Sequence, residues 1–433
     1  MSEKKDLFLA HQQELLMHLA PIKNFLPYLD CCFNPYPVTV PKDVSTNLHA
    51  LASILIKSLD FVATNYISSE SMQAEMPLPK RFLPLLNSAQ SQPYRMGTVR
   101  PDLIFGERGS IKVCEVNARF PLNGMTISQK INEAVGQASY LSRRGYQAST
   151  LSKNICEQML ARFPTDKTLV RVSQSEDGGE SQYFLEEFNK LGGQSIQVRP
   201  EELSLDSRNN IKLGASTLSN FVLEMDREEL FAFDPKVITQ IIQNSNYIND
   251  VRTLILIHDK RVLSLINDPL IMRPHLGVSE HEFLQRYLLK GKELSKQSQR
   301  QEVLTSQKSW VLKRTSGGRG IDLLIGSDTS AGRWGHVINE LRSEFTAQEY
   351  VSPYKMPITH YMDQDSRFSN PMYLVGSLPC FDGKSFGLGM FRASEQPCVN
   401  IGKGQGQAIF LPSAQSDEPT VELRRTQPFQ IQH

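Results

Sequence analysis

Residues 98–117 read TVRPDLIFGERGSIKVCEVN, and this stretch carries the pattern from which the fold can be argued. Two runs rich in apolar and β-branched residues, Thr98–Phe105 and Ile111–Val116, lie on either side of Gly106-Glu107-Arg108-Gly109. Glycines between two such runs are typical of a tight turn. The stretch therefore predicts a β-hairpin.

Four polar side chains accompany this hairpin. Alternation puts Arg100 and Asp102 on one face of the first strand, and it does the same for Glu115 and Asn117 on the second. Two carboxylates and an amide oxygen are ligands that suit Mg²⁺, and an arginine beside them would contact a phosphate or acyl-phosphate oxygen. The alternative is the polar face of a surface hairpin, which the spacing alone does not exclude.

Length and composition narrow the class of protein. The chain has 433 residues, which suggests two or three domains, and 40% hydrophobic content with 21% charged content is ordinary for a globular protein. A net charge of +1 argues against a dedicated nucleic-acid binder. The six cysteines form no CxxC pair, so free thiols are expected rather than a zinc site or a disulfide framework. With no signal-peptide pattern and no apolar run that reaches membrane-spanning length, we expect a cytoplasmic protein without membrane partners.

The chain divides by pattern into an α+β and α/β arrangement. We expect a βαβ unit with a parallel sheet from the strand Thr168–Val172, a helix from 177 to 191 and the strand Ser195–Val198. One polar helix is expected at 280–303. The predicted segments are a helical region at 1–90 with a long helix over Val44–Tyr66, a hairpin and helix at 91–149, an α/β domain at 150–250, a second α+β part at 251–420, and a loosely held tail at 421–433.

A second motif, KSWVLKRTSGGRG at residues 308–320, combines a lysine strand with a glycine loop. Glycines let the backbone approach a ligand and offer N–H groups to phosphate oxygens, while Lys313 can add a positive charge. The motif is neither a Walker A sequence nor a Rossmann G-x-G-x-x-G. An ordinary hairpin remains the alternative. The candidate nucleotide-binding residues here are Lys313, Ser316, Gly317, Gly318 and Gly320.

Two later segments carry weaker signals. One closes an apolar strand and could contact an adenine through its backbone, although any buried strand would look the same; it comprises Gln348, Glu349, Tyr350 and Val351. The other contains Arg392 and Asn400 before a glycine–lysine loop at 402–406. Its pattern is equally typical of an anion-binding site and of a surface loop. His258 has no G-x-S-x-G partner motif, so we treat it as non-catalytic.

In this order, the segments resemble the circularly permuted ATP-grasp ligases, of which the synthetase domain of glutathionylspermidine synthetase is a familiar member. There too, an Arg-x-Asp strand and a Glu-x-Asn strand precede an α/β domain, an Asp-Lys-Arg segment like Asp259-Lys260-Arg261, a Trp-Val-Leu-Lys strand and a Gln-Glu-Tyr-Val segment. The resemblance covers residues 94–410. The chain lacks an amidase domain, residues 1–90 match nothing in the group, and Lys403 is unexpected there, which leaves the substrates open.

The resemblance implies an ATP-grasp fold and an ATP-dependent ligase that joins a carboxylate to an amine, with an amino acid or small peptide as substrate. It implies that Asp102, Glu115 and Asn117 bind Mg²⁺, that Arg100 and Arg392 contact the acyl phosphate, and that ATP is held by Lys260, Lys313, the glycine loop, residues 348–351 and Asn400. A phosphotransferase, or a nucleotide-binding protein without ligase activity, is the alternative. The oligomeric state is left open.

Overall fold

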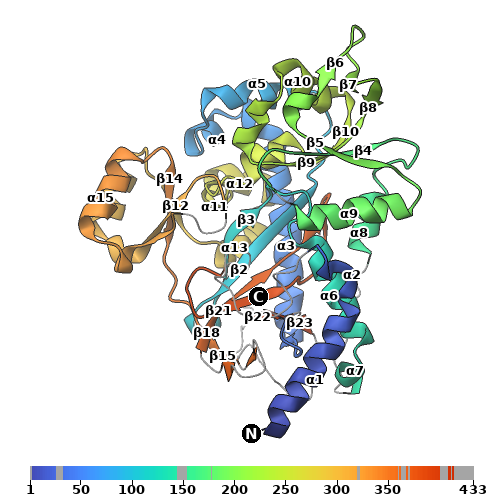
Figure 1. Ribbon diagram of the computed structural model, residues 1–433. Coiled ribbons are helices and arrows are strands. Elements are labelled where there is room, and N and C mark those ends of the chain that lie inside the picture. Colours follow the sequence, from blue (N-terminus) through green and yellow to red (C-terminus); the bar gives the residue numbers. More distant parts are fainter. Residues whose placement is uncertain are drawn as a thin grey trace.

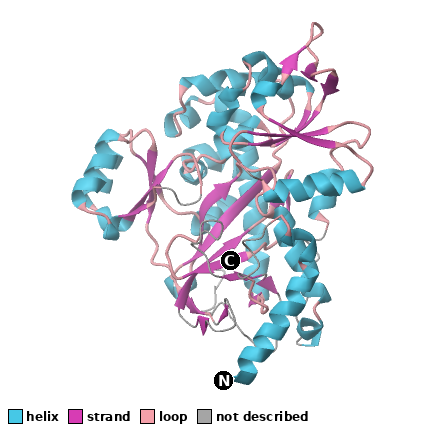
Figure 2. Cartoon of the chain, viewed as in Figure 1, coloured by secondary structure: helices cyan, strands magenta, loops and turns pink. Residues whose placement is uncertain are grey.

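The computed structural model describes residues 2–25, 33–143, 154–176, 178–318, 322–358, 360–361, 367–368, 371–399, 408–410 and 412–413. Gly320 and Asn400, two of the predicted nucleotide-binding residues, lie outside the described residues. Three bodies surround a central sheet (Figure 1): a small lobe with α15, an α/β unit with α9 and α10, and the N-terminal helix α1. Figure 2 shows that helices pack beside each of the larger sheets.

The central sheet is built on the predicted hairpin. Its strands β2 (Thr98–Phe105) and β3 (Ile111–Asn117) are antiparallel, and their register pairs Arg100 with Asn117 and Asp102 with Glu115. Strands from the end of the chain extend the sheet in the order β20-β19-β2-β18-β21-β22, and β15 also pairs with β18. These are β15 (Lys355–Pro357), β18 (Pro371–Ser377), β19 (Cys380–Phe381), β20 (Lys384–Ser385), β21 (Phe391–Ser394) and β22 (Ala408–Phe410).

Helices from both halves of the chain form the largest core, beside the hairpin. The predicted long helix is α3 (Lys42–Asn65), whose buried face includes Leu48, Leu55 and Leu59. By length and composition, Lys42–Ser68 could cross a membrane, contrary to the sequence expectation, but half of its apolar window is buried inside the protein, as in ordinary core helices. Around it pack α4 (Glu70–Glu75), α5 (Leu83–Gln90), a π-helical turn (Thr253–Ile257), α11 (Val262–Asn267), α12 (Pro269–Leu276) and α13 (Val278–Tyr287).

The α/β unit has the predicted βαβ pattern. Its four strands are parallel in the order β10-β9-β4-β5, with α9 connecting β4 to β5. A three-stranded antiparallel sheet, β6-β7-β8, is attached to it. The elements are α8 (Ile155–Leu160), β4 (Leu169–Ser173), α9 (Gly179–Lys190), β5 (Ser195–Val198), β6 (Ser204–Leu205), β7 (Ile211–Leu213), β8 (Ser216–Leu218), β9 (Asn220–Glu224), α10 (Pro235–Asn244) and β10 (Asn246–Ile248).

The small lobe is an antiparallel sheet, β11-β14-β12-β13, covered by two helices. The prediction of a single helix at 280–303 is wrong, because α13 ends at Tyr287 and a strand begins at Gly291. The side chain of Ser264 lies so close to Gly291 that no larger residue would fit there. The lobe has its own apolar core around Trp310, Trp334 and Phe345. Its elements are β11 (Gly291–Glu293), α14 (Gln297–Thr305), β12 (Trp310–Arg314), β13 (Leu324–Ile325), α15 (Ala331–Glu340) and β14 (Phe345–Glu349).

The N-terminal helices pack on the helix that follows the hairpin. Leu15 and Leu19 share a core with Ile131 and Val135 of α6, and Figure 1 shows α1 along α6 and α7. The remaining elements are α1 (Ser2–His18), α2 (Ala20–Lys23), β1 (Val38–Thr39), α6 (Met125–Gln137), α7 (Ser139–Arg143), β16 (His360–Tyr361), β17 (Arg367–Phe368) and β23 (Pro412–Ser413).

One side chain, Asn249, joins the α/β unit to the hairpin. Its Oδ1 accepts the backbone N–H of Thr98 at 2.9 Å, and its Nδ2 donates to the carbonyl oxygens of Ala118 and Phe120 at 3.1 Å. The residue is fully buried. Asn249→Ala should therefore lower the free energy of unfolding by roughly 2–3 kcal/mol, because buried backbone groups lose their partner.

Urea unfolding monitored by circular dichroism measures this loss. Asn339→Ala, at an exposed position of α15, is the control and should change stability by less than about 0.5 kcal/mol. Equal stability of the two variants would contradict the role assigned to Asn249.

Candidate functional site

A cavity of about 860 Å³ opens where the hairpin, the small lobe and the α/β unit meet. The hairpin residues Asp102, Glu115 and Asn117 line it together with Lys313 and Gly318 of the lobe. The two motifs stand about two hundred residues apart in the sequence, so the fold alone brings them together. The structure thus places the predicted metal residues around one space with Lys313 and Gly318, whereas Lys260 and Gly317 do not line it.

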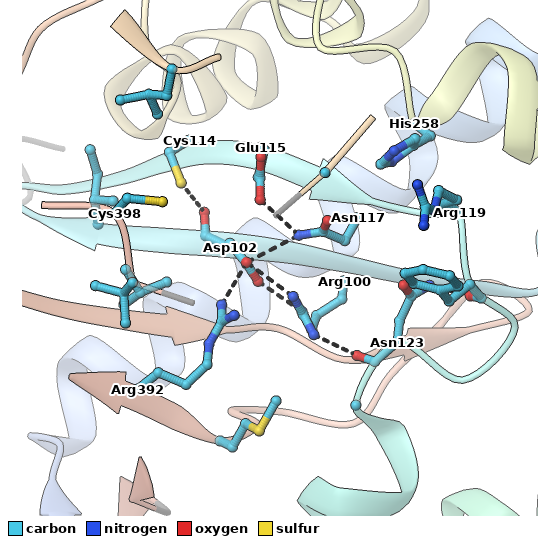
Figure 3. Close-up of a pocket in the computed structure, with 18 of the residues that line it drawn as sticks. Arg100, Asp102, Cys114, Glu115, Asn117, Arg119, Asn123, His258, Arg392 and Cys398 are labelled. Atoms are coloured by element: carbon cyan, nitrogen blue, oxygen red, sulfur yellow. Dashed lines mark hydrogen bonds and ion pairs between the residues drawn. The ribbon is translucent and has the colours of Figure 1, made fainter. Parts of the chain in front are cut away.

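Asp102 is the centre of a buried charge cluster in this cavity (Figure 3). Arg100 donates from Nε to Asp102 Oδ1 at 2.8 Å and from Nη2 to Oδ2 at 3.1 Å, and Arg392 donates from Nη2 to Oδ2 at 2.7 Å. Arg100 also donates from Nη1 to the carbonyl oxygen of Asn123 at 2.8 Å. Burial disfavours a charged Arg100, but Asp102, together with Glu115 and Glu180, outweighs burial and raises the pKa of Arg100. Both predicted catalytic arginines are therefore fixed beside one carboxylate.

Glu115 and two lysines form the adjoining part of the site. Lys260 Nζ lies 4.0 Å from Glu115 Oε2. Burial alone would raise the pKa of Glu115, but the ammonium groups of Lys260 and Lys313 outweigh it and lower the pKa to about 2. Burial lowers the pKa of Lys260, and Glu115 offsets part of this effect. The carboxylate is ionised and open to the cavity, as binding of a cation requires.

Asn117 links the two carboxylates. Its Nδ2 donates to Asp102 Oδ2 at 3.0 Å and to Glu115 Oε1 at 3.1 Å. One atom can thus reach both acidic groups, and rotation of the amide by half a turn would direct its Oδ1 to the same place. This set of hard oxygen donors fits Mg²⁺. Within the described ranges, no group of three or more His, Cys, Asp and Glu is arranged for a metal, so the fit depends on the amide.

One lysine holds the glycine loop, and the other contacts the hairpin. Lys260 donates to the carbonyl oxygen of Gly317 at 2.7 Å, and Lys313 donates to the carbonyl oxygen of Cys114 at 3.2 Å. Gly318 lines the cavity, whereas Ser316 is half-buried and does not line it. Burial raises the pKa of the Cys114 thiol to about 12, so this thiol stays protonated.

The segment Gln348 to Val351 also lines the cavity. The backbone N–H of Glu349 donates to Lys290 and that of Tyr350 to Ser309, each at 2.8 Å. The N–H of Val351 donates to no protein group in the part of the chain that the structure describes. An unpaired backbone donor beside apolar cavity walls is what recognition of a planar base needs.

A buried ion network positions Lys260. Asp259 accepts from Arg261 Nε at 2.9 Å and from Arg227 Nη1 at 2.8 Å, and Arg261 lies 3.5 Å from Glu293 of β11. Burial would raise the pKa of Asp259, but the two guanidinium groups lower it well below its ordinary range. The network joins the α/β unit, the lysine segment and the lobe.

The sequence argument missed other residues that line the cavity. Arg119 extends the alternation of Glu115 and Asn117 by one more step past the end of β3, so the same spacing could have identified it. Asn123 lines the cavity and its carbonyl oxygen binds Arg100. His258, expected to be non-catalytic, also lines the cavity, and no motif in the sequence marks it.

Two comparisons with known proteins agree with this geometry. A family model described as the AnkG N-terminal domain matches residues 51–256, which include the hairpin. The ATP-grasp enzyme ankG of Aspergillus thermomutatus is 22% identical over 424 residues, covering 84% of this chain and 86% of that protein. This likeness supports an ATP-grasp family and suggests an enzyme of the ATP-dependent ligase type. The permuted motif order and the resemblance to glutathionylspermidine synthetase stay predictions.

The buried network gives a prediction about acid stability. Asp259→Asn should lower the free energy of unfolding at pH 7 by about 3 kcal/mol, because two buried guanidinium groups lose their counter-charge. Since the folded-state pKa of Asp259 is depressed, its contribution is complete above the ordinary carboxyl pKa and is lost as the pH falls through the lowered value. The difference between the wild type and the variant should therefore narrow below about pH 4.

Urea unfolding at a series of pH values measures this difference. Asp166→Asn, at an exposed position, should track the wild type throughout. A difference that stays constant down to pH 2 would show that the charge of Asp259 is not what stabilises the fold.

Proposed function

We propose that the protein is an ATP-dependent carboxylate–amine ligase that forms an amide bond through an acyl phosphate and releases ADP and phosphate. One observation carries the proposal: a single cavity holds the acid–amide trio of the hairpin, Lys313 of the lobe and the arginine pair on Asp102. The distant ATP-grasp relative supports the same reaction class. An amino acid or small peptide is the proposed substrate, and the proposed location is the cytoplasm.

The nucleotide would lie between the lobe and the hairpin. Its base would pack against the segment Gln348 to Val351, where the N–H of Val351, unpaired among the described residues, can donate to a ring nitrogen. Lys313 and Lys260 would neutralise phosphate oxygens, and the loop that contains Gly317 and Gly318 would cover them. The present contacts of both lysines to backbone carbonyls keep the ammonium groups directed to this region.

Glu115, Asn117 and Asp102 would hold Mg²⁺. The ion supplies charge neutralisation of the triphosphate oxygens when bound. The low pKa of Glu115, about 2, keeps its carboxylate ionised at every physiological pH. Asp102 Oδ2 already accepts three hydrogen bonds, so Oδ1 is the oxygen with more capacity for a further ligand.

The chain's own residues can then support both chemical steps. An oxygen of the substrate carboxylate attacks the γ-phosphorus and ADP leaves; the amine nitrogen then attacks the acyl carbon, phosphate leaves and the nitrogen loses a proton. Arg100 and Arg392, held on Asp102, would bind the acyl-phosphate oxygens in a partly buried setting where charge-assisted hydrogen bonds are strong. Closure of the lobe would exclude water that otherwise hydrolyses the intermediate.

Nucleotide binding should depend on Lys313 and not on its neighbour Lys308. Lys313→Met should weaken binding of a non-hydrolysable ATP analogue by at least about ten-fold, because a half-buried positive charge proposed to face the phosphates is lost. Lys308→Met, at an exposed position before β12, should bind as the wild type does. Isothermal titration with the analogue and Mg²⁺ measures both, and equal affinities would argue against the placement of the phosphates.

The reaction itself can be tested by ADP release. The enzyme with Mg-ATP should release ADP only in the presence of a matching acid and amine, and mass spectrometry should find an amide product. Glu115→Gln should raise the Mg²⁺ concentration for half-maximal activity by about ten-fold or more. Glu107→Gln in the exposed hairpin turn should not.

A stable phosphoester in place of the amide would identify a phosphotransferase. Nucleotide binding without any turnover across the panel would leave a nucleotide-binding protein. Either result would refute the ligase proposal.

A further inference from the structure

His258 presents an unused hydrogen-bond donor to the cavity. The ring is 4% exposed, and its Nδ1 accepts the backbone N–H of Ala118 at 3.4 Å. An amide N–H can only donate, so Nδ1 must carry a lone pair and the ring proton must lie on Nε2. This Nε2 is buried and has no partner among the described residues. A buried donor without a partner is costly unless a ligand satisfies it.

Arg119 presents a second such donor in the same part of the cavity. Its Nη2 pairs with Glu176 and its Nη1 lies 3.3 Å from Asp226 Oδ2, while its Nε is buried without a partner among the described residues. The guanidinium also lies 4.2 Å from the ring centroid of Phe120. These contacts hold the side chain in place without using Nε. Figure 3 shows Arg119 and His258 beyond Asn117, away from Arg392.

We propose that His258 Nε2–H and Arg119 Nε–H form a two-donor subsite that binds a carbonyl or carboxylate oxygen of the substrate; this inference rests on the proposed ligase function. Two unpaired donors on side chains that line one cavity, with their other nitrogen atoms committed to protein partners, are suited to one acceptor atom or one carboxyl group. The subsite would hold the part of the substrate that lies farther from the nucleotide phosphates.

The charges around the subsite favour a carbonyl or carboxylate oxygen over a multiply charged phosphate. The positive charge of Arg119 is already compensated by Glu176 and Asp226, so little net positive charge is left for a multiply charged anion. The other charged groups that influence His258 are Lys260 and Glu115, of opposite sign. Burial and Lys260 lower the pKa of His258 to about 4, in agreement with a neutral ring. A carboxylate or an amide carbonyl therefore matches the subsite.

Nitrogen NMR of the full-length protein tests the donor directly. With ¹⁵N-labelled histidine, the resonances of His258 are identified by their loss in His258→Gln. We expect a protonated Nε2 and an unprotonated Nδ1. Succinate or succinamide, added with Mg²⁺ and a non-hydrolysable ATP analogue, should shift the Nε2 signal. A shift with succinate only would indicate that the subsite binds a charged carboxylate, and a shift with succinamide only would indicate that it binds a neutral carbonyl. A proton on Nδ1, or no shift with either probe, would overturn the proposal.

Kinetics separates binding from a merely structural role. His258→Asn should raise the KM for the acid or amine substrate by about ten-fold and leave the KM for ATP unchanged, because one donor to the substrate is lost. His258→Gln should recover part of the loss, since glutamine can place an N–H near the position of Nε2 while asparagine reaches only that of Nδ1. Arg119→Lys, which keeps the charge and removes Nε, should behave as His258→Asn does.

Equal rises in both KM values, with no recovery by glutamine, would refute the subsite. If no acid and amine pair releases ADP, the ligase proposal fails, while the NMR titration still decides whether this subsite binds a carbonyl or carboxylate oxygen.

Discussion

The carboxylate of Asp102 organises the interior of the cavity. It accepts hydrogen bonds from Arg100, from Arg392 and from Asn117, and so joins three strands that come from both ends of the sequence. A buried carboxylate is costly on its own, and two arginines beside it would repel each other without it. Each buried charge is therefore stabilised only because the opposite charges lie beside it. Both arginines are thus positioned by this side chain, and Arg100 has a further contact to the carbonyl oxygen of Asn123.

A second set of buried charges, around Asp259, is also stabilised by mutual compensation. Asp259 anchors Arg227 and Arg261 and thereby sets the direction of the segment that carries His258 and Lys260. Lys260 in turn contacts both Glu115 and the glycine loop. Charge compensation thus continues without a break from the α/β unit to the lobe. A ligand with several negative charges would enter a space whose cations are already fixed in position.

Much of this arrangement could be predicted from the sequence, because alternation along β2 and β3 is a local property. The hairpin, the βαβ unit and the lysine strand all lie where the sequence predicts them. The helix expected at 280–303 was wrong, since polar composition does not reveal a short strand such as β11 that forms only by pairing with β14. The same alternation could have identified Arg119. His258 was not, because the role proposed for it rests on a backbone contact to Ala118 that no spacing encodes.

The small lobe has an apolar core of its own, made of residues between Leu294 and Ala347, and shares none of these with the cores of the rest of the molecule. Substitutions that reshape the lobe can therefore accumulate with little effect on the folding of the remainder. The part of the cavity around Arg119 and His258, which we propose to bind the substrate, is built from other elements. In the proposed ligase, preference for a nucleotide and preference for the joined compounds can then diverge independently during evolution, and a protein engineer could exchange one while retaining the other.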